Sequence, residues 1–286
     1  TITMANGSTI INEMTSGIIT DMADTAQVKL VTGGNIGTVS NQARIAEMTN
    51  GDIIKLQGGS SVTDFRGGTI GSLDAVGSDG SFISNFYAGT LTDINAGAHV
   101  EKFYGGTITN VNSGSFVSDL SGCTITNLNL DSIVYWMHSG KIENMYDARV
   151  NGMSTGEITN MYGGSVGPMY SDSKIINFDG GIIESMENTT SITTMGGGTV
   201  TTMSQDATIA NMNGGEVTNM NGGYINNMAA GKIVNLNGGT IGNVGGIVTF
   251  DNIDNVKISG QVDAGGDIDI NADGSARCMT MVTAKK

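Results

Sequence analysis

The chain has 286 residues and a net charge of −14, with 44 glycines and one proline. A hydrophobic content of 38% is too high for a disordered chain, and glycine without a Gly-X-Y period excludes collagen. The acidity argues against a nucleic-acid partner, because phosphate backbones need a basic surface, and no apolar run approaches the about 20 residues of a membrane helix. Cys123 and Cys278 lie too far apart in sequence to indicate a disulfide framework or a metal site.

An apolar repeat begins at the start of the chain. Each unit has an apolar, usually β-branched residue, here called the head, and a second apolar residue three positions later, called the tail. The steps between heads alternate between 9 and 8 residues, which predicts a 17-residue coil with two unlike sides. The first heads form two series with a constant spacing of 17, namely Ile2, Ile19, Ile36, Ile53, Ile70 and Ile11, Val28, Ile45, Val62.

The period is interrupted once in the first half of the chain. The steps Val62–Ile83 and Ile70–Leu91 are both 21 residues, so one coil contains four extra residues. These residues fall in the polar segment 74–81, DAVGSDGS, which we predict to be a protruding loop. Coils of 17 residues then resume, with 16-residue coils near 142–166 and at the end of the repeat.

The most regular stretch is Gly214–Val244, which reads GGEVTNMN, GGYINNMA, AGKIVNLN, GGTIGNV. Gly pairs every 8 or 9 residues leave no room for a helix. Strands that stack in register, about 4.8 Å apart, bury an apolar face that one unit cannot bury alone. We therefore predict an all-β, single-chain parallel β-solenoid (β-helix) of about 14 coils of 16–17 residues, with two strands per coil. A bend or bulge between head and tail would let both point inward.

Residues 1–246 form the predicted shaft of repeats, and residues 247–286 break the unit. We expect the second segment to be a β-rich cap or attachment segment, because an uncapped solenoid exposes a strand edge. Within it, Asp267, Asp269, Asn271 and Asp273 resemble the start of a calcium loop but lack its glycine and its closing glutamate. No metal site, cofactor or catalytic residue is therefore predicted.

Two residue types repeat with the coil and predict structural ladders. Methionine occupies most tails, where its thioether suits a narrow core better than a metal site, which would also need Cys or His. Asparagine lies two residues after many heads, where stacked amides can bond to each other or to turn backbone. The methionine tails are Met14, Met22, Met48, Met137, Met145, Met153, Met161, Met169, Met186, Met195, Met203, Met212, Met220 and Met228. The repeated asparagines are Asn110, Asn127, Asn144, Asn160, Asn211, Asn219, Asn227, Asn235 and Asn243.

Tyrosines gather one residue after tails, in the turns. Tyr87 and Tyr104 are 17 residues apart, and Tyr146 and Tyr162 are 16 apart, so each pair should stack on successive coils. Such aromatic ladders can bind sugars, or they can pack on the corner of the shaft or on a neighbouring chain. The candidate carbohydrate-binding residues are Tyr87, Tyr104, Tyr135, Trp136, Tyr146, Tyr162 and Tyr170.

Two further patterns offer surface functions. Threonines flank the head in three coils, and the flat files they predict resemble ice-binding β-solenoids, although threonine is also a good strand residue. Outward isoleucines beside heads are candidates for self-association. The threonines are Thr90, Thr92, Thr107, Thr109, Thr124 and Thr126. The isoleucines are Ile10, Ile18, Ile54, Ile176 and Ile182.

At GGTITNVN, GGEVTNMN and GGYINNMA the chain resembles Gly-rich repeats of surface proteins and phage tail-fibre proteins of Gram-positive bacteria. The resemblance implies an elongated, extracellular, β-structured fibre. We therefore expect a non-enzymatic structural or adhesive protein of a fibre or filament, which forms a homo-oligomer or homopolymer and binds surface glycans. The alternatives are an ice-binding solenoid and a polysaccharide-degrading β-helix enzyme with surface carboxylates.

Overall fold

The computed structural model describes residues 1–258, 268–270 and 277–281, with side-chain surroundings up to residue 253. The described residues form strands and turns, and they fold as a parallel β-solenoid of about 15 turns, which confirms the predicted fold class. The chain divides into two compact units, Thr1–Glu143 and Asn144–Lys286. No helix in the described part has the length and apolar character that a membrane span needs.

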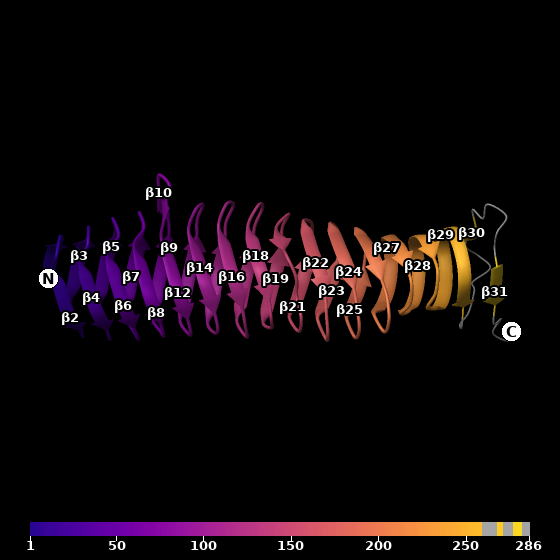
Figure 1. The fold of residues 1–286 in the computed structure, drawn as a ribbon, viewed down its shortest axis with the longest axis horizontal. Coiled ribbons are helices and arrows are strands. Elements are labelled where there is room, and N and C mark those ends of the chain that lie inside the picture. Colours follow the sequence, from indigo (N-terminus) through magenta and orange to yellow (C-terminus); the bar gives the residue numbers. More distant parts are fainter. Residues whose placement is uncertain (259–267, 271–276, 282–286) are drawn as a thin grey trace. The chain divides into compact units, whose positions relative to one another are not determined.

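The first unit contains two parallel stacks of strands, because each strand pairs with the next but one along the chain when the two short strands within 74–81 are left out of the count (Figure 1). One coil therefore contributes one strand to each stack, as predicted. Its strands are β1 (Ile2–Ala5), β2 (Ile10–Met14), β3 (Ile18–Met22), β4 (Gln27–Val31), β5 (Asn35–Val39), β6 (Arg44–Met48), β7 (Asp52–Leu56), β8 (Ser61–Phe65), β9 (Thr69–Leu73), β10 (Ala75–Val76), β11 (Asp79–Gly80), β12 (Phe82–Phe86), β13 (Thr90–Ile94), β14 (His99–Phe103), β15 (Thr107–Val111), β16 (Phe116–Leu120), β17 (Thr124–Leu128) and β18 (Ile133–Met137), while β19 (Lys141–Met145) spans the boundary.

The second unit repeats this arrangement and then lengthens its strands. The 13-residue strand β27 pairs with β25 through its first half and with β26 through its second half, so one strand supplies both sides of a coil. Its strands are β20 (Arg149–Val150), β21 (Glu157–Met161), β22 (Ser165–Met169), β23 (Lys174–Phe178), β24 (Ile182–Met186), β25 (Ser191–Met195), β26 (Thr199–Met203), β27 (Thr208–Met220), β28 (Tyr224–Leu236), β29 (Thr240–Ile258), β30 (Ile268–Ile270) and β31 (Arg277–Met281).

The extra residues in 74–81 form a short antiparallel hairpin of β10 and β11 that stands out from the coil (Figure 1). Gly77, at the tip, has a φ of 65°, which suits glycine in a tight turn. The parallel strand pairing continues across this insertion in the same register, because Val62 pairs with Ile83 and Ile70 pairs with Leu91. The insertion therefore adds a surface feature and leaves the stack of heads intact.

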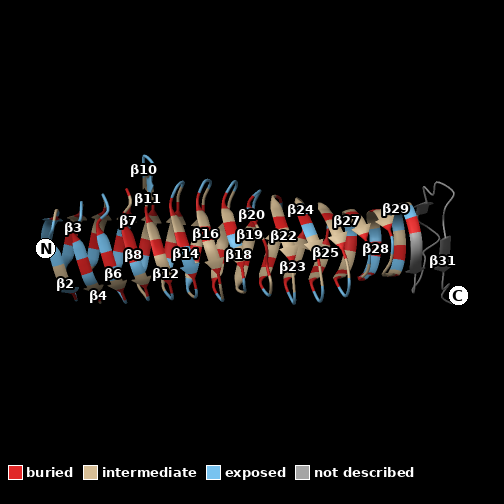
Figure 2. Cartoon of the chain, in the orientation of Figure 1, coloured by how far each residue is buried: buried red, intermediate tan, exposed pale blue. Residues whose placement is uncertain are grey.

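A local irregularity in each strand explains the head-to-tail spacing of three. Between β12 and β14 the register passes from Ile83↔Val100 directly to Asn85↔Lys102, so the residue after each head is left out of the paired positions. The head and the tail of these strands are both buried, and the residues between them face outward (Figure 2). This matches the predicted bulge, since a flat strand would turn a residue three positions later to the opposite face.

Heads and tails form the buried core of both units (Figure 2). Phe65, Phe86 and Phe103 are tails on successive coils of one stack, and their ring centroids are 4.7 Å apart at each step. All the methionines predicted as tails are buried, which confirms their role as core fillers. The predicted burial of the first heads was wrong: Ile2 is 44% exposed and Ile11 is half-buried, because no earlier coil of the described chain covers them.

The parallel ladder continues past residue 246, where the predicted shaft ends. Strand β29 pairs with β28 through Ile233↔Phe250 and Leu236↔Ile253, so Phe250 and Ile253 repeat the head-and-tail spacing. Both side chains are buried. Farther on, β30 and β31 also pair in parallel with β29. The solenoid geometry therefore extends into the segment that we predicted to be a cap or attachment segment.

Candidate functional site

Outward asparagines form ladders of hydrogen-bonded amides, as predicted. In the first unit Asn110 Nδ2 donates to Asp93 Oδ1 at 2.8 Å, and Asn127 Nδ2 donates to Asn110 Oδ1 at 2.9 Å. Each amide donates to the coil before it, so all the amide dipoles point the same way. The carboxylate of Asp93 accepts at the start of this ladder, where an acceptor without a proton fits best.

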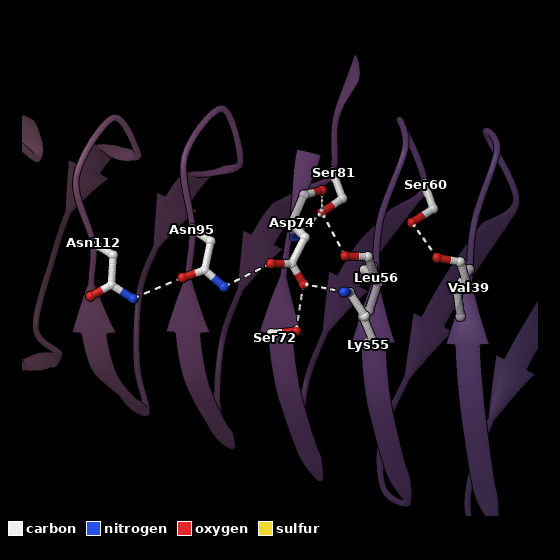
Figure 3. A network of polar contacts seen from close by, with 9 residues as sticks. All are labelled: Val39, Lys55, Leu56, Ser60, Ser72, Asp74, Ser81, Asn95 and Asn112. Atoms are coloured by element: carbon white, nitrogen blue, oxygen red, sulfur yellow. Dashed lines mark hydrogen bonds and ion pairs between the residues drawn. The ribbon is translucent and has the colours of Figure 1, made fainter. Parts of the chain in front are cut away.

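A second ladder begins at Asp74, at the base of the hairpin (Figure 3). Asn95 Nδ2 donates to Asp74 Oδ1 at 2.8 Å, and Asn112 Nδ2 donates to Asn95 Oδ1 at 2.9 Å. The other carboxylate oxygen, Asp74 Oδ2, accepts from Ser72 Oγ at 2.7 Å and lies 3.4 Å from Lys55 Nζ. Asp74 is therefore fully engaged in holding the ladder, which favours a structural role over a catalytic one.

The base of the hairpin is tied to the preceding coil by a buried serine. Ser81 Oγ donates to the Leu56 carbonyl at 3.1 Å, and one coil earlier Ser60 Oγ donates to the Val39 carbonyl at 3.0 Å (Figure 3). Both serines are buried, so these bonds satisfy hydroxyl groups that water does not reach.

The Asp74 ladder gives a testable charge effect. In the Asn95→Asp variant two carboxylates face each other where an amide now donates at 2.8 Å, so we expect the free energy of unfolding at pH 7 to fall by roughly 1–3 kcal/mol. Repulsion raises the pKa of the introduced carboxyl in the folded state. The loss of stability therefore appears as the pH rises above about 3.9, the pKa of an Asp carboxyl in the unfolded chain. Below that pH the loss disappears, because the carboxyl is protonated in both states.

Urea unfolding at several pH values measures this effect. The matched control is Asn112→Asp, whose new carboxylate faces the neutral amide of Asn95 and should show a smaller loss with a shallower pH dependence. Equal unfolding midpoints for the two variants at pH 7 would contradict the ladder geometry.

The two predicted tyrosine stacks are confirmed. The rings of Tyr87 and Tyr104 lie 5.3 Å apart with planes 15° apart, and those of Tyr146 and Tyr162 lie 5.1 Å apart with planes 13° apart. The guanidinium of Arg66 lies 4.4 Å from the ring centre of Tyr87. Each stacked ring has one face against its partner, and Tyr87 has Arg66 over its ring as well. The partner ring therefore removes one face of each tyrosine from contact with a ligand.

An outer aromatic file in the first unit was missed by the sequence analysis. Phe82, His99 and Phe116 are the first residues of β12, β14 and β16, and their rings stack at 5.4 and 4.5 Å with planes 9° apart. Each residue directly precedes a head, and their spacing of 17 was the signal that could have found them.

His99, in the middle of this file, predicts a pH dependence. Its Nδ1 is buried without a hydrogen-bond partner among the described residues, and burial lowers the pKa of the ring below 6.5, while Glu101 acts in the opposite direction. The unfolded chain then takes up a proton at a higher pH than the folded chain. We therefore expect the free energy of unfolding to fall as the pH drops through about 6.5.

Denaturant unfolding between pH 5 and pH 8 measures this slope. His99→Phe should reduce it, because a third phenyl ring continues the stack without titrating. Phe82→Leu, in the same file, should keep the slope while lowering stability at every pH. If the free energy of unfolding changed with pH equally in His99→Phe and in the unmodified chain, His99 could not be the source of the pH dependence.

Tyr135 and Trp136 lie on β18, at the end of the aromatic file. Tyr135 contacts Phe116 at 5.4 Å with planes 82° apart, which is an edge-to-face arrangement. Trp136 lies 6.0 Å from the ring of His138, whose Nε2 is 3.7 Å from Asp119 Oδ1. The structure thus brings two of the seven candidate aromatic residues together with a carboxylate and an imidazole. Tyr170 is half-buried in the turn after β22, outside the Tyr146–Tyr162 pair.

The predicted threonine file lies in register on one stack of the first unit. Thr90 pairs with Thr107 and Thr107 with Thr124, and Thr69 extends the file by one coil. The second set, Thr92, Thr109 and Thr126, occupies the bulge position after each head, so it is offset from the paired residues.

The isoleucines proposed for self-association are mostly exposed. Ile54 is 69% exposed, and Ile10, Ile18 and Ile182 are also exposed, whereas Ile176 is half-buried. They occupy separate strands, and the strand register pairs none of them with another.

Two hollows on the surface of the described residues lack the features of a catalytic cleft. One, of about 190 Å³, lies beside the hairpin and is lined by Asn41, Gln42, Gly58, Val76 and Asp79. The other, of about 270 Å³, lies at the first coils and contains the carboxylate of Glu13. Each hollow carries a single carboxylate, whereas glycoside hydrolysis uses a pair.

The described residues form neither a metal-binding cluster nor a reactive thiol. No group of three or more His, Cys, Asp or Glu residues there could hold a metal ion. Cys123 is buried with its Sγ 3.1 Å from the Phe103 carbonyl, and burial raises the pKa of its thiol to about 12, so the thiol stays protonated at neutral pH. The side chains of the calcium-loop candidates Asp267, Asp269, Asn271 and Asp273 lie outside the described residues.

Comparisons with protein-family models, with curated proteins and with solved structures found no match to this chain.

Proposed function

We propose that the protein is a non-enzymatic structural and adhesive β-solenoid, a component of an extracellular fibre or filament that self-associates and binds surface glycans. The observation that carries this proposal is the continuity of the outward ladders in both units. The second unit has amide ladders with bonds of 2.8 to 3.0 Å, namely Asn144–Asn160–Asn177, Asn211–Asn227–Asn243 and Asn219–Asn235–Asn252.

These ladders connect each coil to the next through side chains as well as backbone. Groups that would otherwise bind ligands or water are bonded along the stack, which resists separation of the coils. A repeated surface whose side-chain amides hydrogen-bond to one another suits a stiff shaft. It also favours a structural role over the polysaccharide-degrading alternative, which would need two carboxylates facing one substrate.

Self-association is supported by exposed isoleucines on the outer surfaces of both units. Covering exposed apolar side chains with a partner removes them from water and lowers the free energy of the assembly. Sedimentation velocity across a range of protein concentrations tests this. Ile54→Lys and Ile182→Lys should shift the assembly equilibrium toward single chains, whereas Thr63→Lys, at another exposed position, should not. A single-chain sedimentation coefficient at every concentration would sink the self-association proposal.

Ice binding is the second candidate, and the register of the threonine file favours it. Thr69, Thr90, Thr107 and Thr124 follow one another at the strand spacing of about 4.8 Å. Thermal hysteresis is the direct test. Hysteresis that is lost in Thr107→Tyr and kept in Thr63→Tyr would support this candidate, and its absence from the unmodified chain would remove it.

A further inference from the structure

Two neighbouring residues of β18 both present aromatic side chains on the outer face. Val134 and Met137 are the buried head and tail of this strand, so the bulge turns Tyr135 and Trp136, which lie between them, outward. In a regular strand consecutive side chains point to opposite faces. The irregularity that lets the head and the tail both enter the core therefore also puts a phenol and an indole, on consecutive residues, on the same outer face.

The orientation of Tyr135 differs from that of the stacked tyrosines. Tyr104 and Tyr162 each lie nearly parallel to a partner ring, at 5.3 and 5.1 Å, whereas Tyr135 meets Phe116 with planes 82° apart. The coplanar stacking that covers a ring face in those pairs is therefore absent between Tyr135 and Phe116. With 44% of its surface exposed, Tyr135 is accessible to a ligand.

Polar groups border Trp136, the second of the two rings. Asp119 is the register partner of Trp136 on the adjacent strand, and its carboxylate lies 3.7 Å from His138 Nε2. The side chains of Asp119 and His138 are 47% and 55% exposed, so both can reach a ligand. A carboxylate accepts hydrogen bonds from hydroxyl groups, and the imidazole can donate or accept them.

We infer that Tyr135, Trp136, Asp119 and His138 form a binding site for a neutral oligosaccharide. The aromatic rings would contact the apolar C–H face of a sugar, while Asp119 and His138 bind its hydroxyl groups. The net charge of −14 and the Asp119 carboxylate disfavour uronic, sialylated or sulfated glycans by repulsion. This inference rests on the proposed adhesive function and assigns it to one place on the first unit.

The full-length chain tests the site directly, because Trp136 is its single tryptophan and reports binding by fluorescence. The probes are cellohexaose, maltohexaose and chitohexaose, with hexagalacturonate as the acidic comparison. At least one neutral probe should change the emission saturably, and hexagalacturonate should bind at least tenfold more weakly. Absence of a saturable change with all three neutral probes, or equal binding of hexagalacturonate, would overturn the inference.

Variants separate the site from the rest of the surface. Tyr135→Ala and Asp119→Asn should each weaken binding at least tenfold, whereas Tyr135→Phe should retain it because the ring remains. Tyr224→Ala, at an exposed position of the second unit outside the candidate binding residues, should leave affinity unchanged. If Tyr135→Ala and Asp119→Asn both bind normally, the assignment is wrong. Sedimentation velocity on the same samples reports self-association separately, so either proposal can fail while the other stands.

Discussion

Phe86→Ala is expected to lower the free energy of unfolding by about 3–5 kcal/mol, one of the largest losses for a single side chain in this fold. Phe86 is fully buried between Phe65 and Phe103, with ring centroids 4.7 Å away on each side. Removing the ring leaves a cavity and breaks two aromatic contacts at once. The neighbouring coils cannot close around the cavity without losing the register of their backbone ladder.

Denaturant unfolding of the full chain, combined with hydrogen exchange, measures the loss and locates it. In a repeat fold each coil contacts only its neighbours, so increased exchange should centre on β8, β12 and β14. Phe82→Ala is the matched control, because Phe82 lies on the same strand but is only half-buried on the outer face. A loss for Phe86→Ala no greater than that for Phe82→Ala would contradict the buried phenylalanine ladder.

Gly106→Ala is expected to cost roughly 2–5 kcal/mol, because it combines backbone strain with a clash. Gly106 has a φ of 94°, and a Cβ at this position would lie 2.6 Å from the Gly89 carbonyl oxygen of the preceding coil. The contact atom belongs to the backbone, so the clash cannot be relieved by rotating a side chain. The substitution should push adjacent coils apart at this turn.

Gly114→Ala provides the comparison, measured by the same unfolding experiment. Gly114 also has a positive φ, of 74°, but the nearest atom to an added Cβ is Ala96 Cβ at 3.4 Å. We expect this variant to lose only about 1–2 kcal/mol, the cost of the left-handed conformation alone. Similar losses for both variants would show that the close approach of successive Gly turns contributes nothing.

The periodicity of the sequence was sufficient to predict the fold. Constant steps of 17 between alternate heads fix which strands stack, and the paired steps of 21 across Val62–Ile83 and Ile70–Leu91 locate the insertion. The observed register follows both. This worked because a solenoid repeats one local geometry, so spacing along the chain converts directly into neighbours in space.

End effects and irregular heads were harder to predict. Ile2 matches the head pattern but is exposed, since burial in a solenoid depends on the coil next to it. Phe250 continues the ladder from Ile233 at the same spacing of 17, yet an aromatic residue in place of a β-branched one concealed it. The repeat rule identifies positions, and packing decides which side chains they accept.

The candidate site could be located only in part from the sequence. The coil length predicted that Tyr87 would stack on Tyr104, but the position of Arg66 over the ring depends on side-chain rotamers. The edge-to-face orientation of Tyr135 has the same origin. Spacing therefore predicts which side chains meet, whereas their orientation, which decides what a ligand can contact, needs the structure.

Negative-stain imaging of the concentrated full chain tests the central claim most directly, namely that this solenoid is a self-associating structural component. Ordered assemblies, joined side by side or end to end, are the predicted result, and Ile54→Lys together with Ile182→Lys should reduce them. Single, unassociated particles at every concentration would contradict the claim.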